Sequence, residues 1–220
     1  MLKQLTVSSS PHLRDNATTQ RLMLDVCIAL LPAGVAAVWF FGLRALILMA
    51  VSVVSAILAE AYYQKRTRQK ITVSDLSAVV TGLLLAYNLP ATAPWWVAVA
   101  GSAIAIILVK QIFGGIGQNF MNPALAARAI LFVSWITLMS QYPEPTPGNF
   151  LVGLVPEAAD AISRATPLAA GNTPLWDLFI GNVSGVLGET SKLALLLGGL
   201  YMLVRRVIEH IGGAEISAPE

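Results

Sequence analysis

The sequence predicts an all-α polytopic integral membrane protein with about six transmembrane helices and a long outer loop. Of its 220 residues, 56% are hydrophobic and only 12% are charged, and the mean hydropathy is +0.70. Soluble domains carry about 25% charged residues, so this composition excludes water as the main solvent of the chain. The apolar residues also gather in runs close to the ~20 residues that a helix needs to cross a bilayer.

Six apolar runs are candidate membrane spans. The third and sixth are the weakest candidates by length and polarity. In chain order, the runs are Leu22–Gly42, Ala45–Tyr63, Ile71–Leu89, Pro94–Phe113, Pro123–Ser140 and Leu193–Val207.

Turn-forming residues separate the runs. Proline disfavours helix in the residue before it, so Asn88-Leu89-Pro90 and Ala93-Pro94 predict a tight turn between the third and fourth runs. The glycine-rich segment 114–119 predicts irregular backbone before the fifth run, with Asn122 as a helix cap before Pro123. Thr72 followed three residues later by Asp75 resembles a capping box at the start of the third run.

The runs divide the chain into five parts. Residues 1–21 form a cytoplasmic N-terminal segment, 22–140 a five-helix membrane region, 141–192 an extracytoplasmic loop, 193–207 a sixth transmembrane helix and 208–220 a polar tail. No cleavable signal is expected, so the first run should remain as a membrane anchor. The loop is far longer than an ordinary connection, and long connections of this kind are commonly functional.

Lysine and arginine placement predicts the orientation, because cytoplasmic loops carry an excess of these residues. A cytoplasmic N-terminus puts ten of them inside and leaves three outside, with Arg128 near the inner end of the fifth run. The long loop then lies on the outer face. The ten inner residues are Lys3, Arg14, Arg21, Lys65, Arg66, Arg68, Lys70, Lys110, Arg205 and Arg206, and the three outer ones are Arg44, Arg164 and Lys192.

Several cofactor and partner classes are excluded by residue counts. Cys27 is the single cysteine, whereas an iron–sulfur cluster takes about four thiolates. His12 and His210 lie outside the predicted spans, which argues against an intramembrane haem. No metal site and no catalytic residue are expected. The net charge of +2 is small and its basic residues are clustered by loop, so nucleic acid is not an expected partner.

A polar stretch in the long loop, residues 160–167, carries the most informative motif. Its Asp-x-x-Ser-x-Ala-Thr pattern resembles the site at which a flavin transferase joins FMN to a threonine hydroxyl through a phosphodiester, here on Thr166. Ala165 leaves the approach to that hydroxyl open, and Pro167 keeps a helix from forming around it. The alternative is an ordinary Asx or Ser/Thr turn.

Four stretches together support a family resemblance. They are residues 9–33, 75–90, 114–124, and the loop motif with Gly188-Glu189-Thr190-Ser191. The combination resembles the D subunit of the Rnf ion-translocating oxidoreductase complex, a relative of the B subunit of the Na⁺-translocating NADH:quinone reductase. The resemblance covers nearly all of Ser9 to Glu209. Family members carry further transmembrane helices after the equivalent of Arg205-Arg206.

The resemblance implies a function in the bacterial inner membrane. It implies covalent FMN on Thr166 as an electron relay between ferredoxin- and NADH-linked partner subunits, coupled to Na⁺ or H⁺ transport. The implied partners are the other subunits of the complex, including a second flavin subunit and iron–sulfur subunits, together with a flavin transferase and membrane lipid. Two alternatives stay open: a solute channel or transporter, and a truncated non-catalytic scaffold subunit.

The resemblance also implies the residues around the flavin. Asp160 and Ser163 belong to the attachment motif, with Asp160 serving the transferase reaction or capping the local turn. Arg164, where the family often has glycine, either pairs with the flavin phosphate or is a solvated loop residue. Gly188 and Glu189 are expected to help enclose the flavin. Their simpler interpretation is the start of the last helix, with Thr190 or Ser191 as N-cap.

Acidic and amide side chains near the spans are weaker candidates. Asp25 lies about one turn inside the first run, where acids are functional candidates by default; a pair with Arg21 is the alternative. Glu60 is expected to be interfacial at the inner end of the second run. Asn119 and Asn122 either contact an ion or cofactor, or serve only the restart of a helix.

Overall fold

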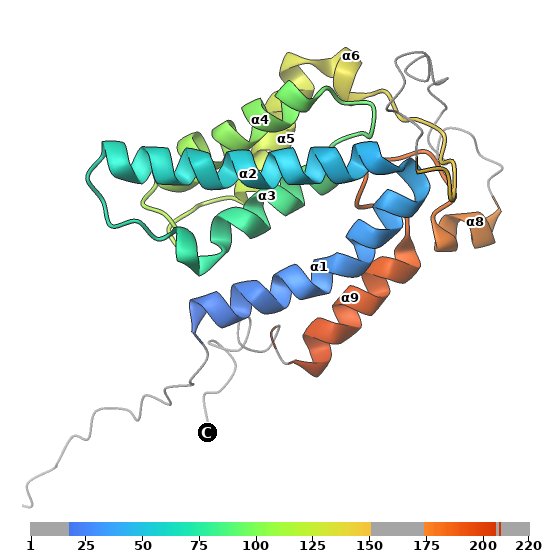
Figure 1. The fold of residues 1–220 in the computed structure, drawn as a ribbon, viewed down its shortest axis with the longest axis horizontal. Coiled ribbons are helices and arrows are strands. Elements are labelled where there is room, and N and C mark those ends of the chain that lie inside the picture. The colour runs from blue at the N-terminus through green and yellow to red at the C-terminus, as the bar shows by residue number, and fades with distance from the viewer. Residues whose placement is uncertain (1–17, 151–173, 206, 208–220) are drawn as a thin grey trace, which may run out of the picture.

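The computed structural model describes residues 18–150, 174–205 and 207, and all regular elements in those ranges are helical (Figure 1). An isolated antiparallel bridge joins Pro90 to Val186. The all-α class is confirmed for the described residues. In chain order, the α-helices are α1 (Thr19–Phe41), α2 (Leu43–Arg66), α3 (Ser77–Tyr87), α4 (Trp95–Ala103), α5 (Pro123–Ser134), α6 (Ile136–Met139), α8 (Leu175–Ile180) and α9 (Lys192–Val204), with a 3₁₀ turn η1 (Val73–Asp75) and a π-helix η2 (Ile104–Gln111).

Two helices match the predicted spans in full. α1 has 23 residues and α2 has 24, and both are long and apolar enough to cross a membrane by length and composition. The other four predicted spans correspond to shorter apolar helices. α3, for example, has 11 residues and rises roughly 16 Å at 1.5 Å per residue, about half of the ~30 Å hydrocarbon core. Six full crossings are therefore not confirmed.

The predicted third span is short because its backbone breaks at both ends. Leu76, with φ 64°, separates η1 from α3, and Asp75 Oδ1 accepts from the Ser77 N–H at 2.9 Å and from the Ser77 hydroxyl at 2.6 Å. The predicted capping box is thus wrong, because the Thr72 side chain caps no helix and instead accepts a hydrogen bond from the Gln64 amide. At the other end, α3 stops at Tyr87, before the predicted turn at Pro90.

Small residues hold the helices around α2 together. Ser52 of α2 donates to the Gly82 carbonyl of α3 at 2.7 Å, and Ser102 of α4 donates to the Ser52 carbonyl at 2.9 Å. A Cβ on Gly82 would lie 2.8 Å from the Val53 backbone, so only glycine permits this approach of α3 to α2. Small residues with interhelical hydrogen bonds are typical of helix packing in membranes.

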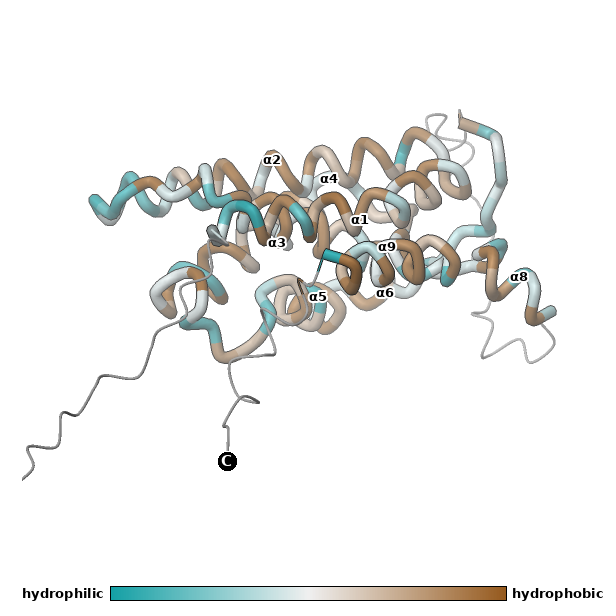
Figure 2. Tube along the Cα trace, turned by 90° about the horizontal axis from the view of Figure 1, so that it is seen from below, coloured by the Kyte–Doolittle hydropathy of each residue, from teal (hydrophilic) through white to brown (hydrophobic). Residues whose placement is uncertain are grey.

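Large apolar side chains point outward instead. Val35 of α1 is 70% exposed and Leu58 of α2 is 62% exposed, whereas alanines at the helix contacts, such as Ala37 and Ala45, are fully buried. Hydropathy follows the same arrangement: hydrophobic residues run along the middle of α2, and hydrophilic ones gather at its C-terminal end (Figure 2). This distribution suits helices that face lipid or apolar partners rather than water.

α9 lies side by side with α1, although they are far apart in sequence (Figure 1). Asp25 of α1, which is buried, accepts from the Tyr201 hydroxyl at 3.0 Å and pairs with Arg205 at 3.3 Å. The Asp25 partner therefore comes from the last helix and is not the Arg21 considered from sequence. Gly198 brings the two backbones together, because its Cβ would lie 2.1 Å from the Ala29 carbonyl oxygen.

Gly198→Ala should lower the free energy of unfolding by about 1–3 kcal/mol, the usual cost of overpacking, because α9 must move away from Ala29. Gly199→Ala is the matched control: a Cβ there meets nothing within 4 Å, and the change gains up to about 1 kcal/mol of helix propensity. Thermal unfolding in detergent measures both. Equal midpoints for the two variants would contradict the α1–α9 contact.

Candidate functional site

The predicted attachment motif lies outside the described residues. Asp160, Ser163, Arg164 and Thr166 fall between 151 and 173. Gly188 and Glu189, the other two predicted site residues, are described and lie in the segment that leads into α9. The candidate site is therefore built from that segment and from the helices that it touches.

Residues 181–191 form an irregular strap against the end of α3. The Leu187 N–H donates to the Leu89 carbonyl at 3.1 Å, and the Gly188 N–H donates to the Tyr87 carbonyl at 2.9 Å. A Cβ on Gly188 would lie 2.3 Å from the Tyr87 Cβ. Gly188 is required by this close approach, so its role in the described structure is to seat the strap on α3.

A cavity of about 180 Å³, with charged side chains in its lining, lies beneath the strap, and we call it the strap cavity. Side chains and backbone of the strap form one wall, and α5 contributes Arg128 to another. Its lining residues are Arg128, Tyr142, Val183, Ser184, Gly185, Val186, Glu189, Thr190 and Lys192.

Arg128 is the central charge of the strap cavity. Its guanidinium donates to Asn88 Oδ1 at 2.7 Å and lies 3.3 Å from Glu189 Oε1. The Lys192 ammonium donates to the Glu189 carbonyl at 2.8 Å, which keeps a second cation at the same cavity. The Thr190 hydroxyl, on a residue only 2% exposed, has no hydrogen-bond partner. The cavity is thus lined by two cations and one carboxylate, and an unpartnered hydroxyl is buried on Thr190 of the same lining.

This chemistry fits a small anion such as a phosphate group better than an aromatic ring. Guanidinium and ammonium groups are the usual protein partners of phosphate oxygens, and an unpaired buried hydroxyl gains a hydrogen bond if an acceptor enters. Sequence reasoning included Glu189 but placed Arg128 near the inner end of the fifth run. The structure instead pairs Arg128 with Asn88 and Glu189, which the predicted topology puts at the outer end. The missed signal was a charged residue flanked by apolar residues within a candidate span, which is costly unless it has a function or a partner.

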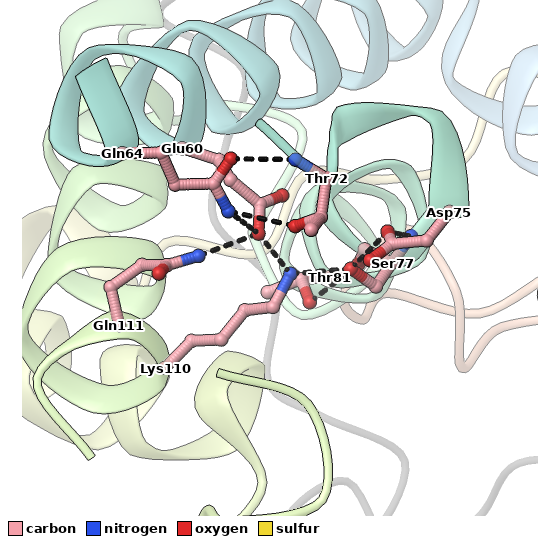
Figure 3. A network of polar contacts seen from close by, with 8 residues as sticks. All are labelled: Glu60, Gln64, Thr72, Asp75, Ser77, Thr81, Lys110 and Gln111. Carbon is pink, nitrogen blue, oxygen red and sulfur yellow. Dashed lines mark hydrogen bonds and ion pairs between the residues drawn. The ribbon is translucent and has the colours of Figure 1, made fainter. Parts of the chain in front are cut away.

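A second polar group, the Glu60 cluster, is buried between α2, η2 and the start of α3 (Figure 3). Lys110 Nζ lies 2.7 Å from Glu60 Oε1, and the Gln111 amide donates to the same oxygen at 2.6 Å. Glu60 is 1% exposed and Lys110 is 2% exposed. Glu60, expected to be interfacial at the inner end of the second run, is thus buried in the helix bundle and held there by an ion pair.

The Glu60 cluster extends towards the surface through α3. Lys110 also donates to the Ser77 hydroxyl, which in turn donates to Asp75 at 2.6 Å (Figure 3). Asp75 lines an open hollow of about 480 Å³ together with Thr72 and Lys70. Glu60 Oε2 has no partner. A continuous set of hydrogen bonds thus joins a buried carboxylate to an accessible one.

The π-helix η2 explains how two consecutive residues, Lys110 and Gln111, both donate hydrogen bonds to the Glu60 carboxylate. In a π-helix each turn closes over i→i+5 bonds, so it contains more residues than an α-helical turn. Lys110 and Gln111 at its end are both buried and both donate to Glu60. A π segment is often found at functional sites, and nothing in the apolar sequence 104–109 distinguishes it from ordinary helix.

Asn119 and Asn122 both hydrogen-bond to backbone groups at the ends of helices. Asn122 Oδ1 accepts from the Ala124 N–H at 3.0 Å, which confirms its predicted capping role. With its amide nitrogen turned inward, Asn119 donates to the carbonyls of Val109 and Lys110, both at 3.1 Å. The Ser191 hydroxyl likewise caps α9 through the Ala194 N–H. These contacts support the simpler interpretation of each residue.

Comparison with known proteins identifies similar chains. Residues 6–212 match the family model described as the NQR2, RnfD, RnfE family. The chain is 50% identical over 213 residues to the D subunit of the Na(+)-translocating ferredoxin:NAD(+) oxidoreductase complex of Acetobacterium woodii, covering 93% of this chain and 64% of that protein. It is 37% identical over 218 residues to the proton-translocating counterpart of Clostridium ljungdahlii, covering 92% and 63%.

A third relative is the D subunit of the ion-translocating oxidoreductase complex of Salmonella paratyphi A. It is 34% identical over 240 residues, covering 93% of this chain and 68% of that protein. The chain thus spans somewhat less than two thirds of the length of the first two relatives and slightly more than two thirds of the third.

Lys110→Met should lower the free energy of unfolding by about 3–5 kcal/mol, because it leaves the Glu60 carboxylate buried without its cation. Glu60→Leu combined with Lys110→Met should recover much of that loss. Lys65→Met is the control, since Lys65 is exposed in the last turn of α2 and a surface change costs within about 0.5 kcal/mol. Chemical unfolding of the four proteins, wild type included, measures the difference; a double variant no more stable than Lys110→Met would contradict the ion pair.

Proposed function

Since the chain belongs to the NQR2, RnfD, RnfE family and resembles its D subunits, we propose that it is a redox subunit of an ion-translocating electron transport complex. In this proposal the subunit carries covalent FMN on Thr166 and passes electrons between ferredoxin- and NADH-linked partner subunits. Electron flow is coupled to the movement of Na⁺ or protons, the two ions that the names of the relatives specify.

Its membrane setting is supported by both the family and the helices. The chain is a membrane-embedded subunit, with α1 and α2 long enough to cross a bilayer. We propose the bacterial inner membrane, a cytoplasmic N-terminus and an outer loop that contains Thr166. The excess of lysine and arginine in the proposed cytoplasmic segments supports this orientation.

The flavin assignment is supported by the loop motif and by the strap cavity. FMN, when bound, accepts and donates electrons one or two at a time, which suits a relay. The residues of this chain would hold it: Thr166 as the point of attachment, and Arg128 and Lys192 as cations next to Glu189. The strap cavity is the single described feature that fits an anionic cofactor group, and it carries the proposal.

The proposed partners follow from what this chain lacks. Its single cysteine, Cys27, is too few for an iron–sulfur cluster, so those centres are assigned to other subunits, as is a second flavin. Attachment of FMN to a hydroxyl needs a flavin transferase. Large exposed side chains, such as Leu196 of α9 and Leu58 of α2, supply apolar surface for lipid and neighbouring subunits.

Thr166→Ala should abolish the fluorescent flavin band that survives denaturing electrophoresis, because no hydroxyl remains to form the phosphodiester. Thr173→Ala, in the same loop, should keep the band. Both are produced with a flavin transferase and viewed under ultraviolet light. If wild-type protein carries no band although the transferase flavinylates a known substrate in the same cells, the flavin assignment is wrong, and a scaffold or solute transporter becomes the better interpretation.

The orientation is tested by labelling single cysteines in a Cys27→Ala background. Thr166→Cys should react with a membrane-impermeant maleimide added to spheroplasts, because its loop is proposed to lie outside. Gln69→Cys, in the exposed connection after α2, should react only after the membrane is opened. The reverse pattern would place the loop in the cytoplasm and contradict the proposed topology.

A further inference from the structure

We propose that the Glu60 cluster is a proton-binding site, in which Glu60 and Lys110 exchange a proton with the solvent through Ser77 and Asp75 (Figure 3). The flavin plays no part in this site, which stands on the contacts of the described helices. Any use of the bound proton in ion movement rests on the proposed function, whereas proton binding itself does not.

The Glu60 carboxylate is buried with all of its hydrogen bonds on one oxygen. Oε1 accepts from the Gln111 amide at 2.6 Å, from Lys110 at 2.7 Å and from the Gln64 amide at 3.4 Å. Oε2 has no partner, although the residue is only 1% exposed. Native proteins keep few unpaired buried polar atoms, so this free oxygen marks the position at which the cluster takes up a ligand.

The formal charges of the cluster leave room for one proton. With every group ionised, the carboxylates of Glu60 and Asp75 oppose a single ammonium, that of Lys110, which leaves one negative charge in excess. A charge without a counter-charge is costly among apolar helices. One added proton makes the cluster neutral.

Charged groups on neighbouring elements do not compensate that excess. Arg128 of α5 pairs with Glu189 beyond the opposite end of α3, and Asp25 of α1 pairs with Arg205 after α9. The remaining cations at this end of the bundle are exposed, and salt screens the interactions of exposed charges. They are Arg21, Lys65, Arg66, Arg68 and Lys70.

The groups around Glu60 favour a proton over Na⁺. A hard cation takes a shell of several oxygen ligands, but N–H donors surround Oε1, and the Lys110 ammonium repels a second cation. Within the described ranges, no three His, Cys, Asp or Glu side chains come together to hold a metal ion. A proton needs only one oxygen, and Glu60 Oε2 supplies it.

The path from the solvent begins in the open hollow of about 480 Å³ that Asp75 lines. Asp75 Oδ1 accepts from the Ser77 hydroxyl at 2.6 Å, and the same hydroxyl accepts from Lys110. A hydroxyl donates and accepts at the same time. Each neighbouring pair on the path is therefore within the hydrogen-bond reach that proton transfer requires.

Uptake of one proton balances over two transfers. First, an N–H bond of the Lys110 ammonium breaks and an O–H bond forms on the Glu60 carboxylate, which leaves a neutral amine beside a neutral carboxyl group. Asp75, protonated from the solvent, then gives its proton to Ser77 Oγ while the hydroxyl proton of Ser77 passes to the amine. Lys110 is again an ammonium, Asp75 is again a carboxylate, and the cluster holds one more proton.

Infrared difference spectroscopy of the purified chain tests the binding step. When the pH is lowered, wild type should gain the carbonyl stretch of a protonated carboxyl group out of contact with water, and Glu60→Gln should lack that band. Asp177→Asn, which removes a carboxyl group of α8 outside the cluster, should keep it. A band of equal size in wild type and Glu60→Gln would overturn the proposal.

Two further measurements keep this test decisive. Glu60→Leu combined with Lys110→Met leaves no unpaired charge, so it should also lack the band and replaces Glu60→Gln if that variant does not fold. Exchange of K⁺ for Na⁺ at constant pH should leave the wild-type band unchanged. If Na⁺ removes the band and K⁺ does not, the ligand of Glu60 is Na⁺ and the proton site is overturned.

The path is tested by the rate at which the band grows after a rapid drop in pH. Ser77→Ala should slow this growth roughly a hundredfold, the lower end of what a positioned proton-transfer group contributes, and leave the final band unchanged. Ser77→Thr keeps a hydroxyl and should retain most of the rate. Ser74→Ala is the matched control, because Ser74 is exposed in the same hollow.

The rate and the final size of the band separate a relay from a structural role of Ser77. Equal rates in wild type and Ser77→Ala would overturn the path. A smaller final band reached at the wild-type rate would show that Ser77 only holds Lys110 in place, and would overturn the path as well.

Neither measurement needs a flavin, so this site and the proposed function fail separately. Thr166→Ala should show the wild-type band and the wild-type rate, although it has no hydroxyl for FMN. Absence of covalent flavin from wild type would refute the proposed function and leave the proton site standing. Absence of the infrared band from flavinylated wild type would refute the proton site alone.

Discussion

Every charged side chain buried among these apolar helices must find its partner inside the protein, and this constraint shapes the structure. Lipid offers no hydrogen bonds, and an isolated buried charge is strongly destabilising. Asp25 therefore meets Arg205, and Glu60 meets Lys110. Each pair joins residues far apart in sequence, so each also fixes how two distant elements pack. Arg128 does the same for α5, α3 and the strap through Asn88 and Glu189.

The short helices follow from the same constraint. A helix that ends inside the bundle leaves unpaired carbonyl and N–H groups, and these are satisfied here by neighbouring segments. The strap supplies Leu187 and Gly188 N–H donors to the end of α3, and Asp75 accepts at its beginning. Irregular backbone next to α3 is thus stabilised by specific contacts.

The sequence was sufficient to predict the helical class, the two long apolar helices α1 and α2 and the cap at Asn122, and it left Thr190 and Ser191 as candidates for the cap of α9. Those features depend on local composition and turn chemistry. It was not sufficient for the lengths of the later helices, because α3 is interrupted by one left-handed residue, Leu76. The partners of Asp25 and Glu60 were also missed. They lie 180 and 50 residues away, and no local pattern reports a pairing at that distance.

The two polar sites lie at opposite ends of one helix. Ser77 and Asp75 connect the beginning of α3 to the Glu60 cluster, and Tyr87 and Asn88 connect its end to the strap and Arg128. Its 11 residues separate these ends by roughly 16 Å. Gly82 also packs α3 closely against α2, because a Cβ there would lie 2.8 Å from the Val53 backbone. A displacement of α3 would change the hydrogen bonds at both of its ends, so the strap cavity and the buried ion pair depend on one shared structural element.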